Sequence, residues 1–202
     1  MSSTGDARLR AAFPMLLPRI WRYGYLQSGE ADTAQDLAQA TCLRVLEKAA
    51  DLRKNDRLDQ WVFAVAHRIW FHEMQALGLT SAQAVPPLDQ PASITWLVAQ
   101  PQDRAELIIL HQIEGFDAKQ IARIQLNPPR QVDGALNASP AHDFMTLSQD
   151  ADALLGAAPA LVIPAASFAA LKARHRKLMA RLAAGLVVTS TLIVWLFGGF
   201  SG

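Results

Sequence analysis

Acidic and amide side chains recur at helical spacing in the segment 30–52. Asp36, Gln39 and Glu47 fall on one side of a helix that turns by about 100° per residue, and Leu43 lies among them. Carboxylate and amide groups can form charge-assisted hydrogen bonds with a basic surface. A leucine within such a face favours contact with another protein, although single leucines are also common on solvated surfaces. The pattern therefore predicts a protein-binding face, with an ordinary solvated face as the alternative.

The other reactive residues form no catalytic or metal-binding pattern. His67 and His72 are five residues apart, a spacing that does not align two imidazoles on one helix face. The other histidines are His111, His142 and His175. Cys42 is the single cysteine, so it is expected as a buried thiol and not in a disulfide. The sequence also lacks a glycine-rich phosphate loop and a serine nucleophile elbow. We therefore expect no enzymatic activity, no cofactor and no bound metal.

The elements that must position these residues are predicted to be helices, because no segment shows sustained alternation of apolar and polar residues. The helices are expected at residues 9–27, from Asp32 or Thr33 to about 52, and at 59–77. Pro14 and Pro18 predict an early kink or a late start in the first helix. The core side of the second helix is the apolar stripe Ala34, Ala38, Cys42, Val45 and Ala49.

The helix at 59–77 carries two apolar stripes. The stripe expected in the core contains Trp61, Val62, Val65 and Ile69. The second stripe contains Phe63, His67, Trp70 and Met74, with Arg68, His72 and Gln75 between the two. Aromatic rings beside basic groups can stack on unpaired bases, which contributes about 1–3 kcal/mol per base. The alternative is that the second stripe packs on a linker or on a second module.

Two motifs in this part of the chain resemble a known family. D-L-A-Q-A-T-C-L-R-V begins at Asp36, and W-V-F-A-V-A-H-R-I begins at Trp61. Over residues 12–76 they resemble the second conserved region of bacterial sigma factors of the extracytoplasmic-function type, with His67 where arginine is usual. The resemblance implies a helical module that binds the RNA polymerase core through Asp36, Gln39, Leu43 and Glu47. It also implies contacts with the minus-ten element of promoter DNA from Trp61, Phe63, His67, Arg68 and Trp70.

Residues 100–147 are predicted to form a second helical module. A helix from Pro101 ends at Gly115, and helices at 118–124 and from Arg130 follow a tight turn. This order is the outline of a helix-turn-helix. The runs Glu114-Gly115, Gln120-Ile121-Ala122 and Val132 resemble the fourth conserved region of sigma factors. The resemblance implies DNA contacts from Arg123, Arg130 and Gln131.

The second module departs from that pattern in ways that weaken DNA binding. Its turn contains Pro128-Pro129. Asp133, Gly134, Asn137 and Ser139 stand where the family has several cations. Residues 103–150 hold four Lys and Arg against seven Asp and Glu, a net charge of 4 − 7 = −3, and binding to duplex DNA requires cations that neutralise phosphates. We therefore expect weak promoter contact here, or a helix-turn-helix used for packing or protein contact.

The segment 182–202 contains no charged residue. Its 21 residues are long enough, as a helix, to cross the roughly 30 Å hydrocarbon layer of a bilayer. Five cations precede it, at Lys172, Arg174, Arg176, Lys177 and Arg181. Because such clusters stay on the cytoplasmic side, we expect a single span at about 182–200 in the inner (cytoplasmic) membrane, with the N-terminal domains in the cytoplasm. A buried C-terminal helix is the alternative.

The fold class expected from these observations is all-α. The predicted parts are a region-two-like domain at 1–78, a linker at 79–99, a degenerate helix-turn-helix at 100–147, a linker at 148–166, and a basic and transmembrane segment at 167–202. The expected function is that of a membrane-tethered sigma-like initiation factor, whose partners are RNA polymerase core, promoter DNA, the inner membrane and an anti-sigma or other sigma regulator. The alternative is a degenerate sigma that acts as a membrane-bound regulatory interaction protein.

Overall fold

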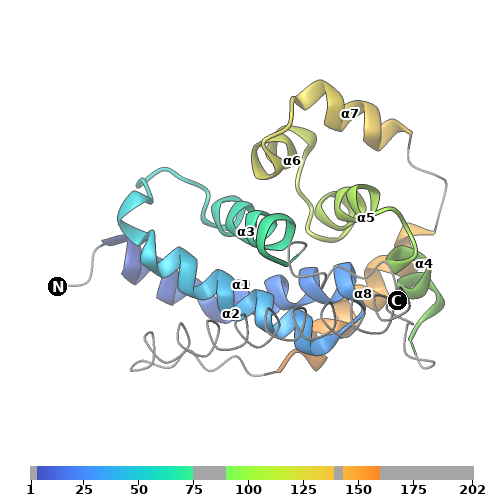
Figure 1. Cartoon of the computed structure of the whole chain (residues 1–202), viewed down its shortest axis with the longest axis horizontal. Helices are drawn as coiled ribbons and strands as arrows, with labels where there is room; N and C mark the ends of the chain where they lie inside the picture. Colours follow the sequence, from blue (N-terminus) through green and yellow to red (C-terminus); the bar gives the residue numbers. More distant parts are fainter. Residues whose placement is uncertain (1–3, 75–89, 139–142, 160–202) are drawn as a thin grey trace, which may run out of the picture. The chain divides into compact units, whose positions relative to one another are not determined.

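The first two helices form a tightly packed pair (Figure 1). In the computed structural model, which describes residues 4–74, 90–138 and 143–159, they are α1 (Thr4–Ser28) and α2 (Ala31–Glu47). Gly29 joins them with a φ of 73°, a left-handed conformation that glycine adopts without strain. Helix α1 begins before the predicted residue 9 and continues through Pro14 and Pro18. At Gly24 a side chain would meet the Cα of Ala34 at 3.0 Å, so this glycine permits the close approach of the pair.

Helix α2 buries the apolar stripe expected from its sequence. All five residues of that stripe are buried, and Leu37 and Thr41 are buried beside them. The helix ends at Glu47 and not near residue 52 as predicted, so Ala49 lies in the turn that follows α2. The prediction of Asp32 or Thr33 as the N-cap is wrong, because the N-cap is Glu30. The chain enters α2 directly after the turn at Gly29, and the Glu30 carboxylate accepts a hydrogen bond from the Thr33 hydroxyl at 2.9 Å.

The third helix of the first half follows a short 3₁₀ turn, η1 (Ala49–Asp51). It comprises α3 (Leu58–Ile69) and a π-helical end, η2 (Trp70–Met74). Residues 75–77, which complete the predicted helix, lie outside the described residues. Helix α3 contacts both α1 and α2, so the predicted α2 face and the two stripes of α3 belong to one helical core.

The second half is also helical. Its elements are α4 (Ala92–Val98), α5 (Gln102–Ile108), the π-helix η4 (Ile109–Ile113), α6 (Ala118–Gln125), α7 (Pro129–Asn137) and α8 (Phe144–Ala157). Asp117 and Gln120 form a capping box at the start of α6. Leu126, with a φ of 58°, makes the turn between α6 and α7. The described residues are thus helices and turns without a β-strand, in agreement with an all-α fold.

Helix α8 covers residues that we expected within a linker. Asp143 caps it by accepting hydrogen bonds from the backbone N–H groups of Met145 and Thr146. Leu147 and Ala151, one helical turn apart, are fully buried. An Ala-rich composition is compatible with a linker or a helix. The burial of two residues that are four positions apart is typical of a helix.

The chain divides into residues 1–161, which form one compact unit, and residues 162–202. Among the described residues, no helix has the length and apolar character needed to cross a bilayer. The predicted span at 182–200 and its basic flank from Lys172 to Arg181 lie outside those residues.

The Cys42 thiol is expected to react slowly. It lies in the core of the α1–α2 pair, and burial raises its pKa from 9.0 to about 11. At pH 8 the reactive thiolate is then about 100-fold rarer than for a free thiol. The rate of reaction with an aromatic disulfide reagent in native buffer, compared with the rate in denaturant, measures this protection. Equal rates would show that Cys42 is accessible.

Candidate functional site

The predicted protein-binding face lies on the side of α2 opposite its buried stripe. Asp36 and Glu47 are exposed, whereas Gln39 and Leu43 are half-buried. Arg44 Nη1 lies 3.5 Å from Glu47 Oε2, so the rim of this face includes a surface ion pair. The structure therefore brings the four predicted residues onto one accessible surface, and their role in binding polymerase stays a prediction.

The predicted DNA-binding residues of α3 and η2 divide into buried and accessible ones. Phe63 and Trp70 have no exposed surface. The Phe63 ring lies edge-on to Tyr23 at 5.7 Å and to Phe116 at 5.1 Å between ring centroids. Because Phe116 belongs to the second half, the stripe packs against the second module in this structure. Stacking of Phe63 on a base therefore requires the two halves to separate.

The core stripe of α3 is largely as predicted. Val62, Val65 and Ile69 are buried, while Trp61 is half-buried. Arg68 is exposed beside it. Of the predicted nucleic-acid contacts on this helix, Arg68 is thus exposed and Trp61 is half-buried.

A buried carboxylate joins four helices at the contact between the halves. Glu106 of α5 is 1% exposed. Its Oε1 accepts hydrogen bonds from the Tyr23 hydroxyl at 2.5 Å and from His67 Nδ1 at 2.7 Å, and its Oε2 accepts one from Gln125 Nε2 at 2.7 Å. Burial, together with the neighbouring Glu106 charge, raises the pKa of Tyr23 well above its usual value. The cluster keeps Tyr23 protonated, so that its hydroxyl remains a donor.

A second buried ion cluster is formed by Arg19 and Arg22 of α1. Arg22, which is 3% exposed, donates to Glu114 Oε1 through Nε at 3.0 Å and Nη2 at 2.8 Å. Arg19 Nε contacts Glu114 Oε2 at 2.8 Å. Arg22 Nη1 also contacts Asp152 of α8 at 2.6 Å. From the sequence, Glu114 was expected only as part of the region-four resemblance, and no role was predicted for Arg19, Arg22 or Glu106.

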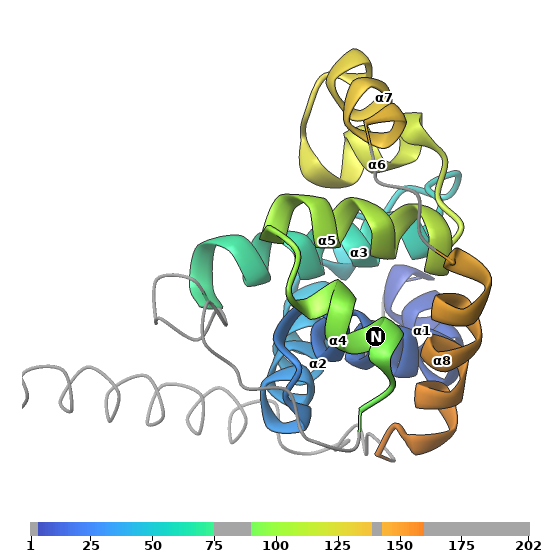
Figure 2. The ribbon, with the colours of Figure 1, turned by 90° about the vertical axis from the view of Figure 1, so that its right-hand side faces the viewer.

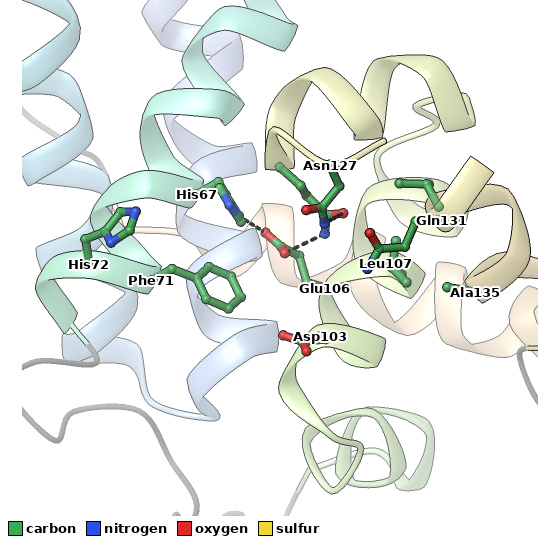
Figure 3. Close-up of a pocket in the computed structure, with 11 residues that line it drawn as sticks. His67, Phe71, His72, Asp103, Glu106, Leu107, Asn127, Gln131 and Ala135 are labelled. Carbon is green, nitrogen blue, oxygen red and sulfur yellow. Dashed lines mark hydrogen bonds and ion pairs between the residues drawn. The ribbon is translucent and has the colours of Figure 1, made fainter. Parts of the chain in front are cut away.

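A cavity of about 600 Å³ with both polar and apolar walls opens beside the Glu106 cluster (Figure 3). His67, His72 and Asp103 line one part of it, and Asn127 and Gln131 of the helix-turn-helix line another. Within the part of the chain that the structure describes, no group of three metal-ligating side chains occurs. The cavity thus places Gln131, a predicted DNA contact, in the space between the two halves.

The helix-turn-helix presents a surface of mixed charge. Lys119, Arg123 and Arg130 are exposed on α6 and α7. Asp117 and Asp133 are exposed on the same two helices. Phosphate binding strengthens with each added cation, and here carboxylates offset most of the positive charge. Weak binding of duplex DNA by α6 and α7 stays a prediction.

Comparisons with known proteins agree with the region-two part of the sequence analysis. Residues 13–77 match the family model for Sigma-70 region 2. The structure is similar to a chain in the co-crystal structure of the sigma factor RpoE in complex with the anti-sigma factor NepR from Bartonella quintana. That match has a TM-score of 0.56 and 20% sequence identity, and it covers 74% of this chain and 97% of that chain. A search of curated proteins found no match. The similarity to the sigma factor complex concerns the fold, and the Sigma-70 region 2 match covers α2 and α3, which carry the predicted polymerase-binding and minus-ten contacts.

Proposed function

We propose that this chain is a sigma-like transcription initiation factor that binds the RNA polymerase core. The observation that carries the proposal is the match of residues 13–77 to Sigma-70 region 2, together with the accessible α2 face of Asp36, Gln39, Leu43 and Glu47. The carboxylates and the amide would pair with a basic surface of the polymerase, and Leu43 would fill an apolar pocket. Specificity of this kind arises from polar groups around an apolar anchor.

The Asp36→Arg variant is expected to bind core polymerase about 10- to 100-fold more weakly than the parent chain, since losing a buried polar contact costs about 1–3 kcal/mol. Asp133→Arg, which reverses an exposed charge on α7, serves as the matched control. Binding is measured by pull-down of purified core polymerase, and helicity by circular dichroism. Unchanged binding by a folded Asp36→Arg protein would contradict the proposal.

The alternative function is that of a regulatory interaction protein, which binds polymerase or another sigma factor without recognising a promoter. The mixed charge of α6 and α7 and the burial of Phe63 and Trp70 favour it. Run-off transcription by core polymerase with the full chain distinguishes the two functions. Promoter-dependent transcripts support the initiation factor, and polymerase binding without transcripts supports the regulator. An anti-sigma protein, the class of partner held by the Bartonella quintana sigma factor, is a proposed partner under either function.

The proposed site of action is the inner membrane, where residues 182–200 would form a single span. The five cations from Lys172 to Arg181 would then face the anionic cytoplasmic leaflet, and each contributes about 1 kcal/mol of attraction. We expect the full chain to stay with membranes during carbonate extraction and a chain without residues 182–202 to become soluble. Release of the full chain at high pH would argue for a peripheral or buried segment instead.

A further inference from the structure

Helix α8 contacts elements of both halves of the chain. It follows the helix-turn-helix in sequence, yet it packs against α1 of the first half as well as α4 and η4 of the second (Figures 1 and 2). Leu147 and Ala151 bury the apolar side of α8 in this contact. The helix is therefore part of the joint between the halves, although it lies outside the residues 13–77 that match Sigma-70 region 2.

Two polar contacts fix the position of α8. Asp152 pairs with Arg22 of α1 at 2.6 Å. Asp150 accepts a hydrogen bond from the Ser93 hydroxyl of α4. Since Arg22 also donates to Glu114 at the end of η4, one buried arginine of α1 holds both Glu114 and Asp152 of α8.

The same closed arrangement covers residues that the proposed function needs. Phe63 is enclosed between Tyr23 and Phe116, and Glu106 holds His67. A promoter base reaches Phe63 only after α3 separates from Phe116. Contacts that tie α1 to η4 and α8 oppose that separation, because the halves cannot part while these contacts persist.

We infer that α8 is an intramolecular clasp, which holds the two halves together and lowers the activity of the factor until α8 is released from α1 and α4. This inference rests on the proposed function, and it adds a regulatory element within residues 144–157. Residues 160–202 follow α8 directly in the sequence. Binding of residues 160–202 to a partner or to a membrane would therefore act directly on α8.

The test replaces Asp152 by arginine. The new side chain repels Arg22, with which Asp152 forms an ion pair. Ala153→Arg is the control, because it adds an arginine at an exposed position of the same helix. Spin labels at Ala50→Cys and Asn137→Cys, both exposed positions, report the separation of the halves in a full-length Cys42→Ala background. Core-polymerase affinity and run-off transcription are measured on the same proteins without labels.

The Asp152→Arg protein is expected to show a longer and broader label distance and about fivefold or greater activity, a typical size for coupling between two states. The Ala153→Arg protein should match the parent, and a peptide of residues 143–159 should shorten the distance in the Asp152→Arg protein.

An unchanged distance in a folded Asp152→Arg protein would overturn the clasp. If that protein unfolds, Ser93→Ala, which removes only one hydrogen bond to α8, must lengthen the distance for the clasp to stand. A longer distance with no polymerase binding by any of the proteins would uphold the clasp and overturn the proposed function.

Discussion

Replacing Glu114 by alanine is expected to lower the free energy of unfolding by about 3 kcal/mol. The substitution removes the carboxylate that faces both Arg19 and Arg22, and Arg22 is almost fully buried. A buried charge that loses its partner must either remain unsolvated or disrupt the surrounding packing. The expected loss lies at the low end of the range for buried pairs because Arg22 keeps Asp152. Urea unfolding followed by circular dichroism measures it.

The matched control for this substitution is Glu47→Ala. Glu47 also pairs with an arginine, but at 3.5 Å on the surface of α2, where such pairs contribute at most about 1 kcal/mol. If the two variants lost the same small stability, the Arg19–Arg22–Glu114 cluster would be no more important for folding than a surface ion pair.

Phe63→Ala is expected to lower the free energy of unfolding by about 3–5 kcal/mol, because it removes a ring from a fully packed site. The ring lies against Tyr23 and Phe116 and has no exposed surface. Met145→Ala, at a side chain that is 73% exposed, should change stability by less than about 0.5 kcal/mol. Thermal and urea unfolding of the parent, Phe63→Ala and Met145→Ala proteins measure the difference in the free energy of unfolding.

This experiment also separates two roles of Phe63. If the Phe63→Ala protein loses both promoter opening and stability, Phe63 is a residue of the core. Loss of promoter opening at unchanged stability would mean that Phe63 acts on DNA and that the closed arrangement contributes little to folding.

Local periodicity was sufficient to predict much of the first half. The α2 stripe and the accessible face of Asp36 and Leu43 follow directly from the helical repeat, because each residue's surroundings are set by neighbours one turn away. The helix-turn-helix was also predictable, since Gly115 and the Pro128-Pro129 pair mark its turns. These features depend on residues that are close in sequence.

The polar clusters were not predictable in the same way. Glu106 meets Tyr23 across 83 positions of sequence, and Glu114 meets Arg22 across 92. Periodicity carries no information about partners at such separations. An acidic residue inside the apolar run at 105–110 was the one available signal of a buried carboxylate. The composition of α8 predicts a linker, whereas in the structure Leu147 and Ala151 bury one face of a helix.

The separation of Arg22 from its partners also has a consequence for synthesis of the protein. Glu106 lies 83 positions after Tyr23 and Glu114 lies 92 positions after Arg22, and at 5–20 residues per second a ribosome needs about 4 to 18 s to add these lengths. During this time the α1–α2 pair can form, but Arg22 and Tyr23 have no carboxylate to bury against. The nascent first half therefore exposes to solvent and to chaperones a surface that the finished chain covers.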